Sequence, residues 1–374
     1  MHKRDSIIYM FYPFVTNGQR DAVQKTLCSR FVGQGPQVDE FEAKFCQKFG
    51  IPFALAVNSG SAALETACDL LDLKPGDKVI TTPLTCTATN LPLIRRGVKL
   101  LWADINPETL NISNESVKGL VELNPDVAAI MNVHLGGIES NLEVFAKLED
   151  HGAMIIPVPV IDDASQAVGI YRGEADFTTY SFQAIKHFTT GDGGMIGMNH
   201  EPSYKQAKLL RWFGIDREKK KANDWQAFKE REMLFDIEVM GHKRHMNDIA
   251  ASMGIKGLEA YDSILEKRKK IFDIYRKIKA PGFKLIDPDV RNVYWLATAL
   301  VENREDFVKK LHDYRIETNL VQIRNDIYKV FGGVRQNLPN MNELENKYVS
   351  IPLQNVMSLE DAEYIKDVIE EGWN

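Results

Sequence analysis

The stretch Phe53-Ala54-Leu55-Ala56-Val57-Asn58-Ser59-Gly60-Ser61-Ala62-Ala63-Leu64 sets the pattern that much of the chain follows. Five apolar residues over 53–57 predict a short buried strand, and the small residues over 58–61 predict a turn. A helical periodicity follows, carried by Leu64, Ala67, Cys68 and Leu71. The first N–H groups of such a helix can hold a phosphate, although Ser59 or Ser61 acting as an ordinary N-cap explains the same residues.

Similar apolar runs recur along the chain, each bounded by Asp, Asn, Gly or Pro. They predict strands over residues 78–81, 99–102, 127–133, 155–161, 177–182 and 195–198. Helical patterns separate several of these runs, so the sequence predicts an α/β fold built from strand-helix units around a largely parallel sheet. The charge-dense stretch 217–231 interrupts the alternation, and we expect it to be an exposed loop or a solvated helix face.

A different pattern begins at Asn247, where a long helical periodicity leads to Pro281-Gly282. The predicted elements beyond it are a strand over 293–301, a helix over 304–314, strands over 316–323 and 349–353, and a closing helix. Ser358 and Asp361 form a capping box in front of that last helix. We therefore predict a large domain over residues 1–250, with an N-terminal arm, and an inter-domain helix with a smaller α+β domain over 251–374.

The composition excludes several classes of protein. With 374 residues and 44% hydrophobic content, the chain is long enough and apolar enough to fold into one to three domains. A net charge of −6 gives no support for binding nucleic acid or an anionic membrane. The four cysteines show neither a C-x-x-C pair nor a neighbouring histidine, which argues against a disulfide scaffold and against a metal site.

Two apolar stretches of the chain do not predict membrane targeting or a membrane span. The run over residues 7–15 contains Pro13, and no small-residue cleavage site follows it. The charge-free run over 79–94 is interrupted by Pro83 and Pro92 and is not a bilayer span. We expect a soluble, cytoplasmic protein without a membrane partner.

Two further positions carry candidate chemistry. Asp162-Asp163 follows the run over 155–161 and therefore lies at the carboxyl end of a predicted strand, where open α/β sheets bind ligands. Neighbouring side chains on a strand point to opposite faces, so only one acid needs to face the site; a helix-capping aspartate is the alternative. Lys186 lies between an aromatic strand and a glycine-rich turn, where burial would make its amine a nucleophile; a solvated surface lysine is the alternative.

A phosphate-holding turn, an acid at a strand end and a lysine 23 residues after it are together what pyridoxal phosphate requires. The acid keeps the pyridine nitrogen protonated, and the lysine bonds the aldehyde. The chain lacks both G-x-G-x-x-G and the P-loop pattern, which weakens a dinucleotide or P-loop interpretation. A nucleotide-binding protein without pyridoxal phosphate would require Lys186 to be an ordinary surface residue.

With these residues in place, the chain resembles the DegT/DnrJ/StrS sugar aminotransferases, and perosamine synthases in particular. The motifs that carry the resemblance are 32–36 (VGQGP), 58–64 (NSGSAAL), 74–77 (KPGD), 133–137 (VHLGG), 162–167 (DDASQA), 181–194 and 350–353 (SIPL). The resemblance implies fold type I, the aspartate aminotransferase-like fold. In that fold a large, mostly parallel sheet of seven-stranded type is joined by a smaller α+β C-terminal domain.

The resemblance also implies the roles of individual residues. Lys186 matches the catalytic lysine that bonds pyridoxal 5′-phosphate and then moves a proton. Asp163 matches the acid at the pyridine nitrogen, and Gln166 matches the amide near the 3-oxygen. The phosphate contacts match Gly60, Ser61 and Ser181. Related dehydratases have histidine in place of the lysine, so its presence favours transamination, with pyridoxamine 5′-phosphate between the two half-reactions.

Three positions depart from the family pattern. Cys86 stands where an aromatic residue usually stacks on the pyridine ring, and a thiol offers less contact area. Lys243 stands where an asparagine usually reaches the phosphate in the neighbouring subunit; a lysine also suits a phosphate, so we expect a homodimer with composite sites. Arg324 lies where many members have a Pro-x-His segment, and it either pairs with a substrate diphosphate or is structural.

The expected activity is amino transfer from L-glutamate to a keto sugar, most directly a nucleoside-diphosphate 4-keto-6-deoxyhexose. Two alternatives stay open. One is another pyridoxal phosphate reaction, such as a dehydratase or an aminotransferase acting on a 3-keto sugar, an amino-cyclitol precursor or a small phosphorylated ketone. The other is a non-catalytic sensor that binds the cofactor or a nucleotide sugar.

Overall fold

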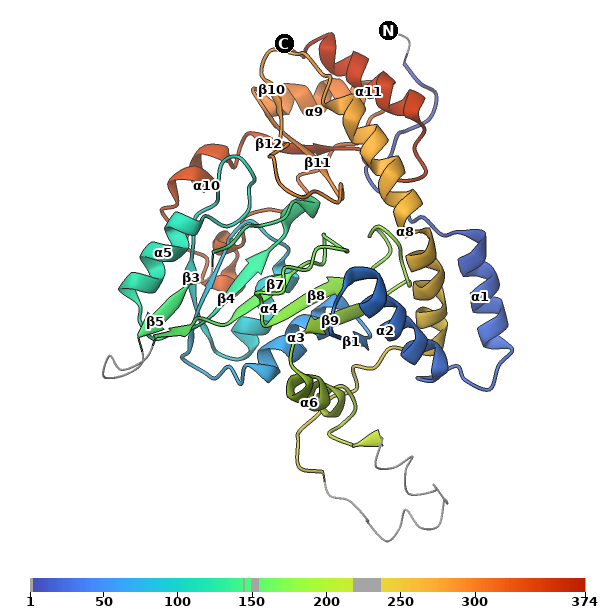
Figure 1. Cartoon of the computed structure of the whole chain (residues 1–374). Helices are drawn as coiled ribbons and strands as arrows, with labels where there is room; N and C mark the ends of the chain where they lie inside the picture. The colour runs from blue at the N-terminus through green and yellow to red at the C-terminus, as the bar shows by residue number, and fades with distance from the viewer. Residues whose placement is uncertain (1–2, 144, 149–154, 218–236, 374) are drawn as a thin grey trace.

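The computed structural model describes residues 3–143, 145–148, 155–217 and 237–373, and a seven-stranded sheet lies at its centre (Figure 1). The strand order is β1-β9-β8-β7-β4-β2-β3. The strands are β1 (Phe53–Val57), β2 (Lys78–Thr81), β3 (Lys99–Trp102), β4 (Val127–Val133), β7 (Val160–Asp163), β8 (Phe177–Ser181) and β9 (Gly194–Met198). Only β9 runs antiparallel to its neighbours in this sheet. The predicted α/β class and mostly parallel sheet are confirmed.

Helices cover both faces of the sheet, and α1 (Asn17–Leu27) packs on α8 (Asp248–Tyr275) outside them. The other helices of this part are α2 (Pro36–Phe49), α3 (Gly60–Leu70), α4 (Thr87–Arg95), α5 (Asn114–Leu123) and α6 (Glu201–Arg211). The alternation of β1 explains the two layers: Ala54 and Ala56 join the core formed with α2 and α8, whereas Leu55 and Val57 join the core formed with α3. Both faces of β1 are therefore buried, as its continuous apolar run predicted.

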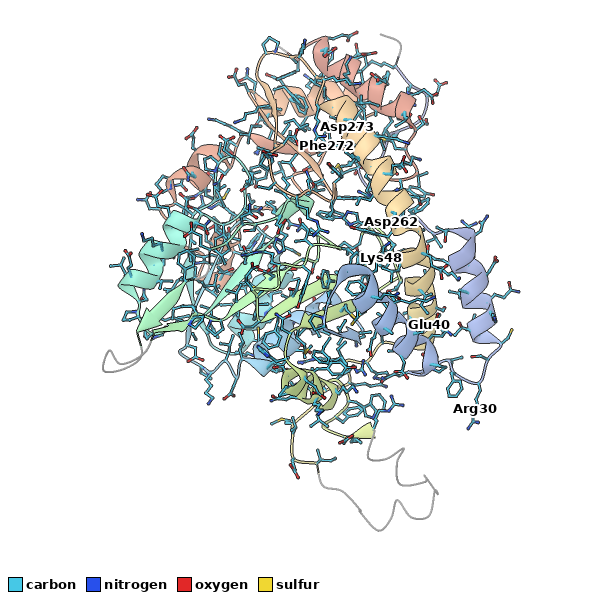
Figure 2. The ribbon with its side chains drawn as sticks, in the orientation of Figure 1. Arg30, Glu40, Lys48, Asp262, Phe272 and Asp273 are labelled. Carbon is cyan, nitrogen blue, oxygen red and sulfur yellow. The ribbon has the colours of Figure 1, made fainter. Side chains whose placement is uncertain are left out.

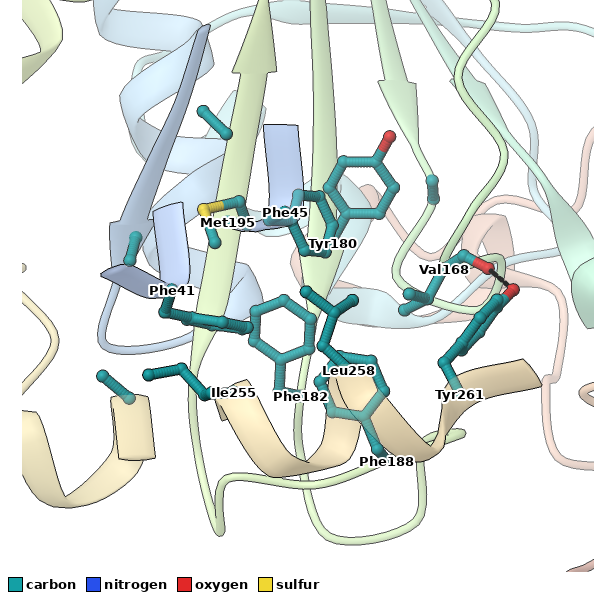
Figure 3. Packing of buried hydrophobic residues seen from close by; sticks show 14 of the residues in the cluster. Phe41, Phe45, Val168, Tyr180, Phe182, Phe188, Met195, Ile255, Leu258 and Tyr261 are labelled. Atoms are coloured by element: carbon teal, nitrogen blue, oxygen red, sulfur yellow. Dashed lines mark hydrogen bonds between the residues drawn. The ribbon is translucent and has the colours of Figure 1, made fainter. Parts of the chain in front are cut away.

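Aromatic rings fill the space between the sheet and α8 (Figure 3). Phe182 lies 5.3 Å from Phe41 and 5.2 Å from Phe188, measured between ring centres. Tyr261 on α8 donates its hydroxyl to the Val168 carbonyl, the dashed line in Figure 3. Phe182 and Phe188 flank the loop that carries Lys186, so this packing fixes both ends of that loop.

The C-terminal part contains a three-stranded antiparallel sheet in the order β10-β11-β12. Its elements are β10 (Phe283–Leu285), β11 (Ala297–Val301), α9 (Arg304–Asp313), α10 (Pro339–Leu344), β12 (Tyr348–Ile351) and α11 (Leu359–Glu370). The predicted capping box of Ser358 and Asp361 is present at the start of α11. The division at residue 250 falls in the first turn of α8 and stays a prediction.

The N-terminal arm joins this C-terminal part rather than the large sheet. Ile8 pairs with Ile316 in a parallel bridge and is buried in the core of the small sheet. Its N–H donates to the Arg315 carbonyl at 2.8 Å, and its carbonyl accepts from Glu317 at 3.0 Å. Figure 1 shows the arm beside the C-terminal helices, at the far end of α8 from α2.

Two predicted strands are wrong. The run over 155–161 divides into β6 (Ile155–Pro157) and β7, and β6 pairs instead with β5 (Ala146–Leu148). Pro157 and Pro159 lack the N–H groups that a continuous central strand requires, which explains the division. The run over 316–323 forms only single bridges at Ile316 and Asn319, because Val321 has a φ of 56° and turns the chain. Most of the predicted loop over 217–231 lies outside the described residues.

Exposed ion pairs join α2 to α8 on the outer surface. Lys48 Nζ lies 2.9 Å from the Asp262 carboxylate, and Figure 2 labels both residues. Such a pair contributes at most about 1 kcal/mol, so the buried aromatic packing dominates the stability of this contact.

In the part of the chain that the structure describes, no helix is long and apolar enough to cross a membrane.

Candidate active site

The predicted site residues gather at the carboxyl ends of β7 and β8 and at the first turns of α3 and α4. Asp163 ends β7, and Ser181 ends β8. Gly60 and Ser61 begin α3, and Cys86 immediately precedes α4. The parallel pairing of β7 with β8 brings these ends to one edge of the sheet, as expected for an open α/β fold.

The start of α3 forms a narrow anion-binding turn. Ser59 is the N-cap and accepts from the Ala62 N–H at 3.1 Å, so the N-cap explanation holds for Ser59. The N–H groups of Gly60 and Ser61 come before the first intrahelical donor, the Ala63 N–H that donates to the Ser59 carbonyl, so the helix itself offers them no acceptor. A Cβ placed on Gly60 would lie 2.8 Å from Ser181 Cβ, so only glycine allows β8 to approach this turn.

The two aspartates at the end of β7 point to different environments. Asp163 is buried; one of its oxygens accepts from the Thr89 hydroxyl at 2.7 Å and the other from the Ser165 N–H at 2.9 Å. Asp162 is held by Asn132 at 2.8 Å and lies 3.3 Å from His134 Nε2. Burial opposes ionisation of Asp162, but His134, Arg172 and Asn132 together outweigh it, and the pKa of Asp162 is lowered. Asp162 is thus held by its own neighbours, whereas Asp163 is the acid bonded to Thr89 at the start of α4.

Lys186 lies in an apolar setting. Burial lowers its pKa to about 8, against the opposing influence of Asp163 and Cys86, which are close enough to favour its charged form. Its Nζ lies 4.2 Å from the centre of the Trp295 ring, a cation–π contact. The Trp295 indole donates to the Ile185 carbonyl at 3.3 Å. About one-tenth of Lys186 is consequently a neutral amine at pH 7, far more than of a solvated surface lysine.

Gln166 and Cys86 border the same site. The Gln166 side-chain oxygen accepts from the Gly136 N–H at 2.8 Å, so its NH₂ group is the end able to donate to a ligand oxygen. Cys86 is a half-buried free thiol at the N-cap position of α4. Cys86 acts to raise the pKa of Lys186, so the thiol lies near the amine.

Lys243 and Arg324 differ in their surroundings. Lys243 is exposed, and its carbonyl accepts from the Asn58 side chain of the same chain at 3.4 Å. Its contact with a partner's cofactor stays a prediction. Arg324 is buried, with two donors on the carboxylate of Asp326 and the others on Asn342, Glu345 and the Gln336 carbonyl. The guanidinium N–H groups of Arg324 are thus bonded within the protein, which favours a structural role over pairing with a substrate diphosphate.

Sequence reasoning missed three residues near the predicted ones. Trp295 reaches Lys186 from the segment before β11, and no local pattern indicates this. Thr89 donates to Asp163, and Thr85 contacts Thr89 in turn; the only signal for this pair is two hydroxyls spaced by four residues. A pocket of about 660 Å³ lies between α2 and α6 and is lined by none of the predicted site residues. The volume of a pocket therefore does not identify the candidate active site.

The site residues fit pyridoxal phosphate. Gly60, Ser61 and Ser181 would hold the phosphate, Asp163 would meet the ring nitrogen, and Gln166 would donate to the ring oxygen. Lys186 supplies an amine whose charged form is disfavoured. When bound, the cofactor supplies an aldehyde that bonds amines and a ring that accepts electrons.

Comparison with known proteins agrees with this chemistry. Residues 15–370 match the DegT/DnrJ/EryC1/StrS aminotransferase family. The chain is 30% identical to a UDP-4-amino-4,6-dideoxy-N-acetyl-beta-L-altrosamine transaminase of Campylobacter jejuni, covering 93% of each protein. It is 26% identical to GDP-perosamine synthase of Escherichia coli O157:H7, covering 98% of this chain and 99% of the synthase. The crystal structure of AtS13 from Actinomadura melliaura superposes with a TM-score of 0.86 at 28% identity, covering 99% of this chain and 100% of AtS13.

The fold, the site and these similarities together define a pyridoxal 5′-phosphate-dependent aminotransferase. More particularly, the chain belongs to the DegT/DnrJ/EryC1/StrS aminotransferase family. The resemblance seen in the sequence motifs is thereby confirmed.

The pKa of Lys186 predicts how cofactor loading depends on pH. Only the neutral amine attacks an aldehyde, so the loading rate should rise about tenfold per pH unit below about pH 8 and level off above it. Stopped-flow absorbance after mixing cofactor-free protein with pyridoxal phosphate, between about pH 6 and pH 10, measures this profile. Nα-acetyl-lysine is the matched control, because its amine is unperturbed. A protein profile that keeps rising like the control would contradict the depressed pKa.

Proposed function

We propose that this aminotransferase moves an amino group from L-glutamate to the keto group of a nucleoside-diphosphate 4-keto-6-deoxyhexose and releases an amino sugar. The observation that carries the proposal is the half-buried Lys186 amine with Asp163 and Cys86 around it. The names of the Campylobacter and Escherichia relatives, both of which concern nucleotide-linked amino sugars, support the class of acceptor.

The residues divide the work between binding and proton transfer. Gly60, Ser61 and Ser181 would anchor the cofactor phosphate, and Asp163 would keep the ring nitrogen protonated. Lys186 Nζ would bond the aldehyde of the resting cofactor. As a free amine, it would take a proton from the glutamate α-carbon and later return one to the sugar carbon that receives the amine. Because 2-oxoglutarate leaves before the sugar reacts, the kinetics should be ping-pong.

The functional unit in this proposal is a homodimer with two composite sites. Lys243 is exposed, next to the end of β1 and the start of α3. An ammonium there suits the phosphate of a neighbouring subunit's cofactor as a point charge. The oligomeric state and the cofactor affinity of Lys243→Ala test this arrangement together.

Stepwise addition of substrates tests the proposed reaction. Cofactor-loaded protein is mixed first with L-glutamate and then with a panel of nucleoside-diphosphate keto sugars, while the visible spectrum is recorded. We expect glutamate to remove the visible band and one sugar to restore it. If glutamate leaves the spectrum of loaded protein unchanged, the proposed donor is wrong. If glutamate acts but every keto sugar fails, the proposed acceptor is wrong.

A further inference from the structure

Asp163 receives a hydrogen bond from a side chain that the predicted reaction does not use. Thr89 Oγ1 donates to Asp163 Oδ2 at 2.7 Å, and both groups are buried. Thr85 Oγ1 lies 2.8 Å from Thr89 Oγ1, also buried. An ionised carboxylate only accepts, so the Thr89 proton points to Asp163, and the proton between the hydroxyls must come from Thr85. The order of donation is Thr85 to Thr89 to Asp163.

This use of a helical threonine differs from that of two other buried threonines in the molecule. A threonine inside a helix commonly donates to the carbonyl four residues earlier. Thr26 does so with the Ala22 carbonyl at 2.8 Å, and Thr66 does so with the Ala62 carbonyl at 2.7 Å. Thr89 lies in the first turn of α4, but its hydroxyl is directed to the carboxylate instead.

The acceptor that Thr89 would otherwise use is occupied from the C-terminal part of the chain. The carbonyl four residues before Thr89 belongs to Thr85, and it accepts from Asn325 Nδ2 at 2.7 Å. The Asn325 N–H also donates to the Pro83 carbonyl at 2.7 Å. Asn325 is itself buried and holds the loop that carries Thr85 and Cys86. The arrangement thus leaves the Thr89 hydroxyl available to Asp163.

We infer that Thr89 is a positioning residue for the acid that meets the cofactor ring, and that Thr85 sets the direction of the Thr89 hydroxyl. The inference deepens the proposed function and rests on its assignment of Asp163 to the ring nitrogen. With Thr89 on one oxygen and the Ser165 N–H on the other, the carboxylate cannot rotate freely about its bond to Cβ.

The test compares variants by cofactor retention, measured by equilibrium dialysis without substrates, and by the position of the visible band. Thr89→Val keeps the shape and removes the donor, and we expect about tenfold weaker retention with a shifted band. Thr89→Ser should restore both properties. Thr85→Val should change both in the same direction but less, because Thr89 keeps its own proton. Thr26→Val is the matched control: it removes one buried hydroxyl from α1, and we expect wild-type values.

Asp163→Asn separates the possible failures. If Asp163→Asn changes retention and band but Thr89→Val matches wild type, the positioning role of Thr89 is overturned. If Asp163→Asn itself leaves both readouts unchanged, the assignment of Asp163 is wrong and the inference fails with it. If Thr89→Val and Thr89→Ser lower the melting temperature of cofactor-free protein equally and lose cofactor equally, the Thr89 side chain acts by packing and not by its hydroxyl, which also overturns the inference.

Discussion

Replacing Lys186 with alanine is expected to lower the rate of amino transfer by about a thousandfold or more, because one side chain supplies both the nucleophile and the proton carrier. Lys186→Arg should lose as much, since a guanidinium stays protonated and cannot attack a carbonyl. Single-turnover rates with glutamate, followed in the visible spectrum, measure the loss. Borohydride treatment should attach the cofactor permanently to the natural protein and to neither variant.

The same substitution should leave the fold intact. The pKa of Lys186 is about 8 in the folded protein, below its ordinary value, so at pH 7 the charged lysine costs stability, and that cost falls as the pH rises through 8 toward the unfolded value. Alanine removes the cost, so the melting temperature at neutral pH should not fall sharply. Lys74→Ala, at an exposed lysine, is the control and should keep full activity. A Lys186→Ala protein that retained a tenth of the natural rate would contradict the assignment of Lys186 as the catalytic lysine.

The largest loss of stability is expected at Arg268. This buried arginine donates to Asn355 Oδ1 at 2.7 Å and to the carbonyls of Leu353, Trp295 and Tyr294. Burial lowers its pKa to about 10, which leaves it charged at neutral pH. Arg268→Met strands several buried acceptors, each costing about 1–3 kcal/mol, so the free energy of unfolding should fall by at least about 3 kcal/mol. Urea denaturation measures the change.

A neighbouring lysine on the same helix provides the control. Lys269 is exposed and pairs with Asp273, and Lys269→Met should change the free energy of unfolding by less than about 0.5 kcal/mol. Arg268→Lys should fall between the two, because an ammonium lacks the fork that reaches several acceptors at once. Equal effects of Arg268→Met and Lys269→Met would show that the buried network contributes little.

The sequence predicts which residues lie at the carboxyl ends of the strands, because position along the chain determines this. Once β7 and β8 are parallel neighbours, Asp163 and Ser181 must lie at one edge, and the first turn of α3 lies there too. Alternation along the strand also directs Asp162 and Asp163 to opposite faces of the sheet. These inferences need only the period of a strand and the direction of a chain.

Contacts between distant segments limit what the sequence alone predicts. Arg324 resembles a free phosphate-binding fork until Glu345 and Asn342 occupy it, 21 and 18 residues away along the chain. Trp295 reaches Lys186 across more than a hundred residues, and nothing in either local pattern connects them. The run beginning at Ile316 is apolar enough for a strand, but Ile8 supplies its only parallel neighbour among the described residues, and Val321 then turns the chain.

The bridge between Ile8 and Ile316 has a consequence for synthesis on the ribosome. The arm emerges some three hundred residues before its hydrogen-bonding partners Arg315 and Glu317. Loop closure over such a separation is slow, so the arm must wait without its partner while the large sheet folds. An N-terminal fusion that folds quickly would hold the arm away from that late docking step, whereas a C-terminal fusion would not.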